Sequence, residues 1–434
     1  MSKHAGGPLC AAALLLLARR VEAGGFSIFD QGARGMGFGG AYSAQAADPS
    51  AVFYNPAGLA FLRNSKQLLT VSTLKYQMTQ FRGTSPAPGP GVHENTSRQL
   101  LIPPAAYYCD RLTSHLSLAV GVFTPFGITT SWSDPDHFSG RFISQSFLLR
   151  GFAASPAVAW RFSHHFSAGA TLDVRFSSLA LDRSLPLVDP NTGVVSDAGQ
   201  AKLKSDTKAN VGFALGILAK PTRLLSIGMA YHHGVSAHYK GKAALTLKQQ
   251  GDQALDALAR QQFGEGSIPF KTTVAFPAFA AVGVAYDPKD WTIEADTVWY
   301  QWSRFDHIAF EFPTSSLNQT IPAHYHDSYQ LRMGAEKRFN TWTLRAGYFL
   351  DPRPGPPSSV SPTLPTSTHH GLSGGFAWRP AVLTRWSSAF MTFDITGRYV
   401  IAKDSSTMQG SSLHYDGTYS GRVYEFSSSL GYTF

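Results

Sequence analysis

The sequence predicts a transmembrane β-barrel of fourteen antiparallel strands, and three observations predict it. Segments with alternating apolar and polar residues recur along the chain, as strands with one apolar face require. The gaps between them switch between 2–8 residues and 16–40 residues, as periplasmic turns and extracellular loops of outer-membrane barrels do. Charged residues make up 15% of the chain, against about 25% in soluble domains, and aromatic residues 13%, enough for interfacial girdles.

The expected strands share this period of two and are even in number, as bacterial single-chain barrels require. They span residues 67–79, 98–108, 115–124, 153–162, 166–180, 206–219, 223–238, 279–286, 290–302, 327–338, 341–350, 370–379, 388–402 and 419–434. The barrel is therefore expected to occupy residues 67–434.

The two faces of a strand are clearest between residues 166 and 176. Its even positions are apolar: Phe166, Ala168, Ala170, Leu172, Val174 and Phe176. Its odd positions are Ser167, Gly169, Thr171, Asp173 and Arg175. One face therefore suits lipid and the other a polar lumen. By the same rule Glu294 and Asp296, in the strand 290–302, face the lumen.

Both ends of the chain carry signals of export. Residues 1–23 have a basic start at Lys3, an apolar stretch over 9–18 and a small-residue cleavage site at Val21-Glu22-Ala23, which predicts a signal peptide cleaved after Ala23. The last residue, Phe434, resembles the C-terminal signal that the barrel-assembly machinery recognises. We therefore expect the mature protein in the bacterial outer membrane.

Residues 24–66 do not alternate and are rich in glycine and alanine. Irregular backbone at membrane depth is tolerated only inside protein or a wet cavity. The segment is therefore predicted to form a plug, or hatch, inside the barrel.

Several motifs resemble the FadL-type outer-membrane transporters of long-chain fatty acids and other hydrophobic molecules. They are Asn55-Pro56-Ala57 and Ala41-Tyr42-Ser43 in the plug segment, Thr124-Pro125-Phe126-Gly127, Trp302-Ser303-Arg304-Phe305, Arg332-Met333-Gly334-Ala335-Glu336, and the run from Trp342 to Tyr348. The resemblance covers essentially the whole mature chain. It implies a monomer in which extracellular loops capture the ligand, a pocket above the hatch holds it, and a gap in the wall releases it sideways.

Candidate residues follow for each of these steps. For capture, the loop 239–278 offers Leu245, Leu247, Leu255 and Leu258, in a stretch that could become helical; packing of the loop on its neighbours is the alternative. For lateral release, Gly121, Pro125 and Gly127 favour a break in the third strand, although an ordinary strand end is the alternative. Asn55, Pro56 and Ala57 are the expected gate of the hatch, or only a turn that seats it.

The ligand is less well defined by the sequence. Arg175, Arg332, Arg345 and Lys337 are the expected lumen charges for an anionic head group. The family usually carries an acidic residue and an arginine where this chain has residues 365–370, and their absence weakens the case for fatty acid. An aromatic hydrocarbon transporter of the same fold and a general porin are the alternatives.

Enzymatic, metal and cofactor functions are not predicted. No set of nucleophile, base and acid can be assembled from the sequence, and the pairs His164-His165, His232-His233 and His369-His370 point to opposite strand faces. The net charge of +9 could attract outer-membrane lipid and lipopolysaccharide phosphates, with solvated loops as the alternative.

Overall fold

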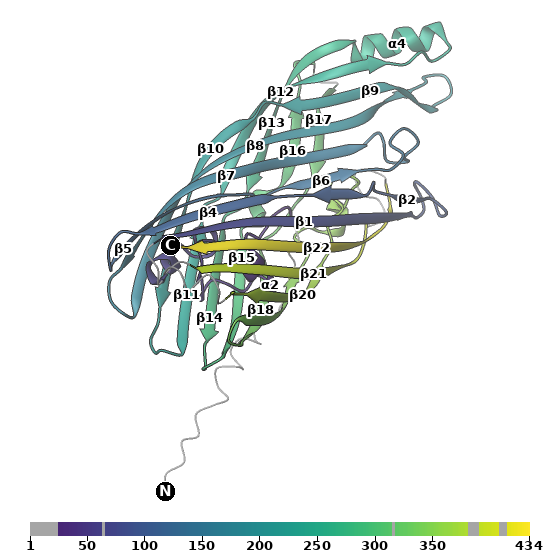
Figure 1. Cartoon of the computed structure of the whole chain (residues 1–434). Coiled ribbons are helices and arrows are strands. Elements are labelled where there is room, and N and C mark those ends of the chain that lie inside the picture. The colour runs from purple at the N-terminus through teal and green to yellow at the C-terminus, as the bar shows by residue number, and fades with distance from the viewer. Residues whose placement is uncertain (1–24, 63–65, 315–316, 381–389, 408–414) are drawn as a thin grey trace.

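The computed structural model describes residues 25–62, 66–314, 317–380, 390–407 and 415–434, whose strands form one closed antiparallel barrel (Figure 1). The predicted number of fourteen wall strands is confirmed. The ring closes where β1 (Lys66–Gly83) pairs with β22 (Gly417–Thr433) from Gln67 opposite Thr433 to Gly83 opposite Gly417. Closure removes the unpaired strand edges that lipid could not satisfy. The predicted signal peptide lies outside the described residues.

Seven wall strands are single elements and seven are broken into consecutive pieces. The single ones are β1, β7 (Ser146–Arg161), β8 (Phe166–Val188), β19 (Trp342–Asp351), β20 (His369–Trp378), β21 (Phe390–Ser406) and β22. The others are β2 (His93–Asn95), β3 (Gln99–Leu101) and β4 (Pro104–Arg111); β5 (Leu116–Phe123) and β6 (Ile128–Ser131); β9 (Val195–Ser205) and β10 (Lys208–Ala219); β11 (Leu225–His232) and β12 (Val235–Leu247); β13 (Gly266–Phe276) and β14 (Phe279–Tyr286); β15 (Trp291–Tyr300) and β16 (His307–Glu311); and β17 (Gln319–Pro322) and β18 (Ser328–Arg338).

The predicted faces of the strands are confirmed where the alternation is clear. On β8, Leu172 is 49% exposed and points outward, whereas Asp173 is 3% exposed and points inward. Glu294 and Asp296 on β15 also face inward and are buried. The outer surface carries an apolar belt with aromatic side chains, among them Trp160, Phe213, Tyr329 and Tyr424, as lipid contact requires.

The predicted loops 181–205 and 239–278 are wrong in part, because strands continue through them. β8 runs on to Val188 and pairs there with β9, while β12 pairs with β13. Leu245 and Leu247 belong to β12 rather than to a helix, because the alternation of Tyr239, Ala243 and Leu245 with exposed lysines continues the strand. These hairpins form a tall extension of one side of the wall (top of Figure 1).

The helices are short. α4 (Gln253–Phe263) lies at the tip of the extension and carries Leu255 and Leu258. It begins after Asp252, whose side chain accepts a hydrogen bond of 2.7 Å from the Ala254 N–H, the usual N-cap arrangement. Among the described residues, the other helical pieces are α2 (Ala33–Gly37), α3 (Ala51–Tyr54), η1 (Pro56–Phe61), η2 (Trp302–Arg304) and η4 (Pro357–Ser359). No helix within the described ranges is both long and apolar enough to cross a membrane.

Candidate functional site

Residues 25–62, the N-terminal segment, press against the inner face of the wall from several directions. Wall glycines provide the room for this contact. A Cβ atom added at Gly216 on β10 would lie 2.1 Å from the Asn55 side chain, and Cβ atoms at Gly228 on β11 or Gly347 on β19 would lie 2.0 or 2.1 Å from backbone atoms of the segment. Real Cβ atoms do not approach so closely, so the segment is seated where these side chains are missing.

The triplet Asn55-Pro56-Ala57 ties this segment to the wall. The Asn55 amide is fully buried and donates to the carbonyl oxygens of Ser43, at 2.8 Å, and Ile217 on β10, at 3.0 Å. Its oxygen accepts a hydrogen bond of 3.1 Å from the Ala57 N–H, and Pro56 begins η1. The triplet therefore joins a turn of the segment to β10, and it does not line the cavity described below.

Residues 98–105 and residues 123–130 lie on neighbouring strands of the wall but do not pair with each other. This interruption is here called the wall gap. β4 and β5 pair as far as Ala106 opposite Val122. Pairing across the gap resumes only at an isolated bridge that involves Thr96. A closed sheet would normally continue its hydrogen bonds here, so the hydrogen-bond ladder of the barrel is interrupted between these two neighbouring strands.

Local sequence explains the gap. Pro103 and Pro104 have no N–H to donate to a neighbouring strand, and the chain from Thr124 to Gly127 turns inward to the N-terminal segment. There the Ile28 N–H donates to the Pro125 carbonyl at 2.8 Å, and the Gly127 N–H donates to the Phe26 carbonyl at 2.9 Å. Part of the backbone that would have paired within the wall is thus paired with the N-terminal segment.

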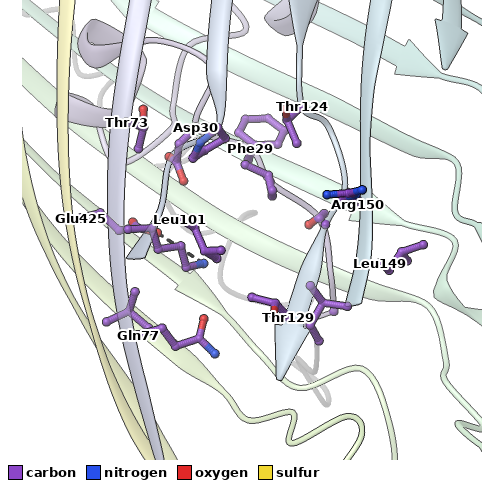
Figure 2. A pocket seen from close by; sticks show the side chains of 18 of the residues that line it. Phe29, Asp30, Thr73, Gln77, Leu101, Thr124, Thr129, Leu149, Arg150 and Glu425 are labelled. Atoms are coloured by element: carbon purple, nitrogen blue, oxygen red, sulfur yellow. Dashed lines mark ion pairs between the residues drawn. The ribbon is translucent and has the colours of Figure 1, made fainter. Parts of the chain in front are cut away.

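A cavity of about 860 Å³ connects the wall gap with the interior of the barrel. Figure 2 shows it between β1 on one side and β6 and β7 on the other, with Phe29 and Asp30 at the end formed by the N-terminal segment. The gap contributes Leu101, Ile102, Pro103, Pro104, Thr124, Gly127, Ile128 and Thr129. A volume of this size suits a lipophilic ligand of drug size or larger.

Two basic residues in the cavity are neutralised by ion pairs. Arg398 on β21 contacts both oxygens of Asp30, with Nη1 to Oδ1 at 2.6 Å, and its Nε donates to Glu425 at 2.6 Å. The Lys75 ammonium lies 3.5 Å from Glu425. Burial alone raises the pKa of the Asp30 carboxyl, but the Arg398 guanidinium outweighs burial and holds this pKa below its ordinary value of 3.8. Asp30 is therefore charged and links the N-terminal segment to the wall.

Arg332 differs from Arg398. It lines the cavity and is 4% exposed, yet within the described part of the chain its guanidinium forms no ion pair with a carboxylate. It lies over the Phe29 ring, 3.9 Å from the centroid, and donates to Gln330. Its Nε is buried and has no hydrogen-bond partner among the described residues. The carboxylates of Asp30 and Asp351 interact with it electrostatically without forming an ion pair, so its guanidinium can still take a directly bonded anionic partner.

The other predicted charges lie elsewhere. Arg175 pairs with Asp173 at 3.1 Å, and Arg345 pairs with Glu336 at 2.8 Å; neither lines this cavity. Lys337 was expected in the lumen, and this prediction is wrong. It stands opposite Trp291 on the outer face, with Nζ 4.9 Å from the indole ring, because one step along a strand reverses the facing.

The structure places the residues predicted for ligand capture and those predicted for lateral release in different parts of the barrel. Leu245 is buried on β12, and Leu255 and Leu258 pack against the apolar core of the extension; none of the three lines the cavity. Pro125 and Gly127 lie in the wall gap, whereas Gly121 lies in the paired part of β5, opposite Ser155.

Sequence reasoning missed Phe29, Asp30, Arg398 and His369, which all line the cavity. Arg398 could have been found, because it shares the inward face of its strand with Asp394. Phe29 and Asp30 belong to a segment without period, so no pattern indicates their direction.

Comparisons with known proteins agree with this geometry. The family described as outer membrane protein transport protein (OMPP1/FadL/TodX) matches residues 14–434. A 47 kDa outer membrane protein of Pasteurella multocida is 22% identical over 361 residues, which are 79% of this chain and 81% of that protein.

Two solved structures share the fold. The structure of a Pseudomonas aeruginosa FadL homologue superposes with a TM-score of 0.82 at 20% identity, covering 94% of this chain and 100% of that one. The toluene transporter TodX of Pseudomonas putida superposes with a TM-score of 0.71 at 18% identity, covering 96% and 99%.

Proposed function

Because the chain belongs to the OMPP1/FadL/TodX family of outer-membrane transport proteins, we propose that it carries hydrophobic molecules with an anionic head group inward across the outer membrane. The family consists of transport proteins rather than enzymes. The fold is that of an outer-membrane transporter of hydrophobic compounds. The substrate class and the route through the wall are the proposal.

The observation that carries the proposal is the cavity between the N-terminal segment and the wall gap. An aqueous pore has no need of an opening in its side, whereas a lipophile gains by leaving directly into the bilayer. The gap edges are apolar at Leu101, Ile102 and Pro103. A ligand held above Phe29 can therefore pass sideways into lipid without crossing the periplasmic end of the barrel.

Arg332 supports an acidic head group. Its guanidinium borders the cavity with no carboxylate partner in the described structure, while Arg398 is already paired with Asp30 and Glu425. A carboxylate at Arg332 would gain a charge-assisted hydrogen bond, with the apolar tail directed toward the wall gap.

The remaining steps of the proposed route are capture of the ligand by the extension and its retention by the N-terminal segment. The tall extension, where Leu255 and Leu258 on α4 pack against its core but stay only half-buried, offers a first apolar contact beyond the membrane. The N-terminal segment, tied down by Asn55, forms the floor that keeps the ligand from the periplasmic opening. Binding at Phe29 and Asp30 touches that floor directly.

An aromatic hydrocarbon is the second candidate substrate. The similar fold of the toluene transporter TodX and the absence of acidic and arginine residues over residues 365–370 favour it. Such a ligand needs no partner for a head group, so its transport would not depend on Arg332.

Uptake by cells that lack their own transporter tests the proposal. We expect labelled oleate to enter when the chain is expressed, and Arg332→Gln to lower this uptake about tenfold or more, as the loss of a hydrogen bond between charged groups implies. Arg161→Gln, at the periplasmic end of β7, is the control. Toluene uptake alone would move the substrate to hydrocarbons. Free passage of small sugars without either ligand would favour a porin.

A further inference from the structure

We propose that Glu294 and Asp296 on β15 form a carboxylate clasp that holds the N-terminal segment in its closed position. The inference deepens the proposed function and rests on it in one respect, namely that the segment closes the lumen. The clasp acts on a single turn, residues 42–45, and is defined by backbone hydrogen bonds rather than by ion pairs.

Each carboxylate accepts two consecutive N–H groups of this turn. Asp296 Oδ2 accepts from the N–H of Tyr42 at 3.0 Å and of Ser43 at 2.9 Å. Glu294 Oε1 accepts from the N–H of Ala44 at 2.7 Å, and its Oε2 accepts from Gln45 at 3.2 Å. Four successive backbone donors thus converge on two side chains of one strand.

The same turn is fixed from its other side. The Ser43 carbonyl accepts a hydrogen bond of 2.8 Å from the Asn55 amide. The triplet therefore bonds to the C=O of the peptide unit between Ser43 and Ala44, and the clasp bonds to its N–H. On the wall, β14 leaves room for Asp296, because a Cβ atom at Gly283 would lie 2.1 Å from Asp296 Oδ1. The turn at residues 42–45, the Asn55-Pro56-Ala57 triplet and the wall strands β14 and β15 therefore lie close together here.

Most inward carboxylates differ from this pair in having a cation within ion-pair distance. Asp173, Glu336 and Glu425 each pair with an arginine of the wall or lumen. Glu294 and Asp296 form no ion pair in the described residues, and both are buried. The N–H groups of the turn therefore supply the hydrogen bonds that a wall arginine supplies to carboxylates elsewhere, and a wall cation would remove that dependence on the segment.

This arrangement suits an element that must release. If the turn moves away, water in the lumen can hydrate both carboxylates, so opening exchanges protein hydrogen bonds for water. One acceptor, Asp296 Oδ1, already has no hydrogen-bond partner among the described residues. The clasp thus favours the closed position without locking it.

Thiol labelling of the turn tests the clasp in the full-length protein. In a Cys109→Ser background, Ala44→Cys places a buried thiol between the two carboxylate contacts. We expect the double variant Glu294→Gln with Asp296→Asn to speed labelling by a polar thiol reagent about tenfold or more, since neutral acceptors bind N–H groups with about half the strength of carboxylates. Ionic conductance across planar bilayers should rise in parallel.

Asp173→Asn is the matched control, because it removes a buried inward carboxylate that contacts only wall residues in the described structure. Heat-dependent migration on gels reports whether each barrel has folded, and the two single variants serve if the double variant does not fold. Labelling and conductance equal to those of the wild type would overturn the clasp. Absence of oleate uptake by the wild-type protein, with labelling still accelerated in the double variant, would leave the clasp standing and overturn the proposed substrate.

Discussion

Neutralisation of buried charge constrains individual residues inside this barrel. Arg175, Arg345 and Arg398 each have a carboxylate partner, while Glu294 and Asp296 use backbone N–H groups of the N-terminal segment. An unpaired buried charge is strongly unfavourable. Arg332 is the exception on which the proposed function depends, because it has no ion pair within the described residues and its unused hydrogen-bonding capacity borders the cavity.

The close contact of the N-terminal segment with wall glycines gives a prediction about a single residue. Gly216→Ala should displace Asn55, because the added Cβ would lie 2.1 Å from its Oδ1. We expect the free energy of unfolding in lipid vesicles to fall by roughly 1–3 kcal/mol, as overpacked sites do, and conductance to rise. Gly374→Ala is the control, since nothing lies within 4 Å of its Cβ position. Equal effects of the two changes would contradict this account of the seat.

At the scale of elements, the wall gap follows from where backbone donors are used. Proline removes donors at positions 103 and 104, and the residues around Pro125 bond to the N-terminal segment instead of to a strand. The third predicted strand therefore ends as β5 and resumes as β6, with the cavity at the break. The same two residues that marked a possible strand end, Pro125 and Gly127, lie at this break.

Filling the wall gap should block the proposed lateral release. Thr129 on β6 lines the cavity at the gap, and Thr129→Trp would place a large ring in the path of a lipophilic ligand. We expect uptake of oleate to fall about tenfold or more, the usual effect of a steric clash in a binding path, with normal barrel assembly. Thr70→Trp, at a lipid-exposed position of β1, should leave uptake unchanged; a decrease in both variants would argue against the lateral route.

At the scale of the whole molecule, a closed wall and an internal segment have separate sources of stability. The ring of strands closes without the segment, because β1 pairs with β22 along its length, although Pro125 and Gly127 beside the wall gap bond to the segment. The segment depends on the wall for its partners, through Asn55, Asp30 and the turn at residues 42–45. We therefore predict that the wall can fold without the segment, whereas the segment cannot adopt this conformation without the wall.

Deletion of residues 25–62 therefore tests whether the wall is stable without the N-terminal segment. We expect the shortened barrel to assemble in the outer membrane and to conduct ions steadily, because no segment would then fill the lumen beside the wall glycines. Single-channel recording in planar bilayers measures this directly. A deletion variant that folds but stays as poorly conducting as the full chain would show that another part closes the lumen.

The sequence by itself determined the strand number, the order of strands and the direction of most wall side chains, because a period of two is a local property of each strand. It misplaced Lys337 by one step and read the strands of the extension as loops, since polar alternation beyond the membrane resembles loop composition. Only the tertiary structure decided which interior residues meet. The N-terminal segment has no period, so the approach of Phe29 to Arg332, of Asp30 to Arg398 and of residues 42–45 to β15 depends on how the segment is seated within the closed wall.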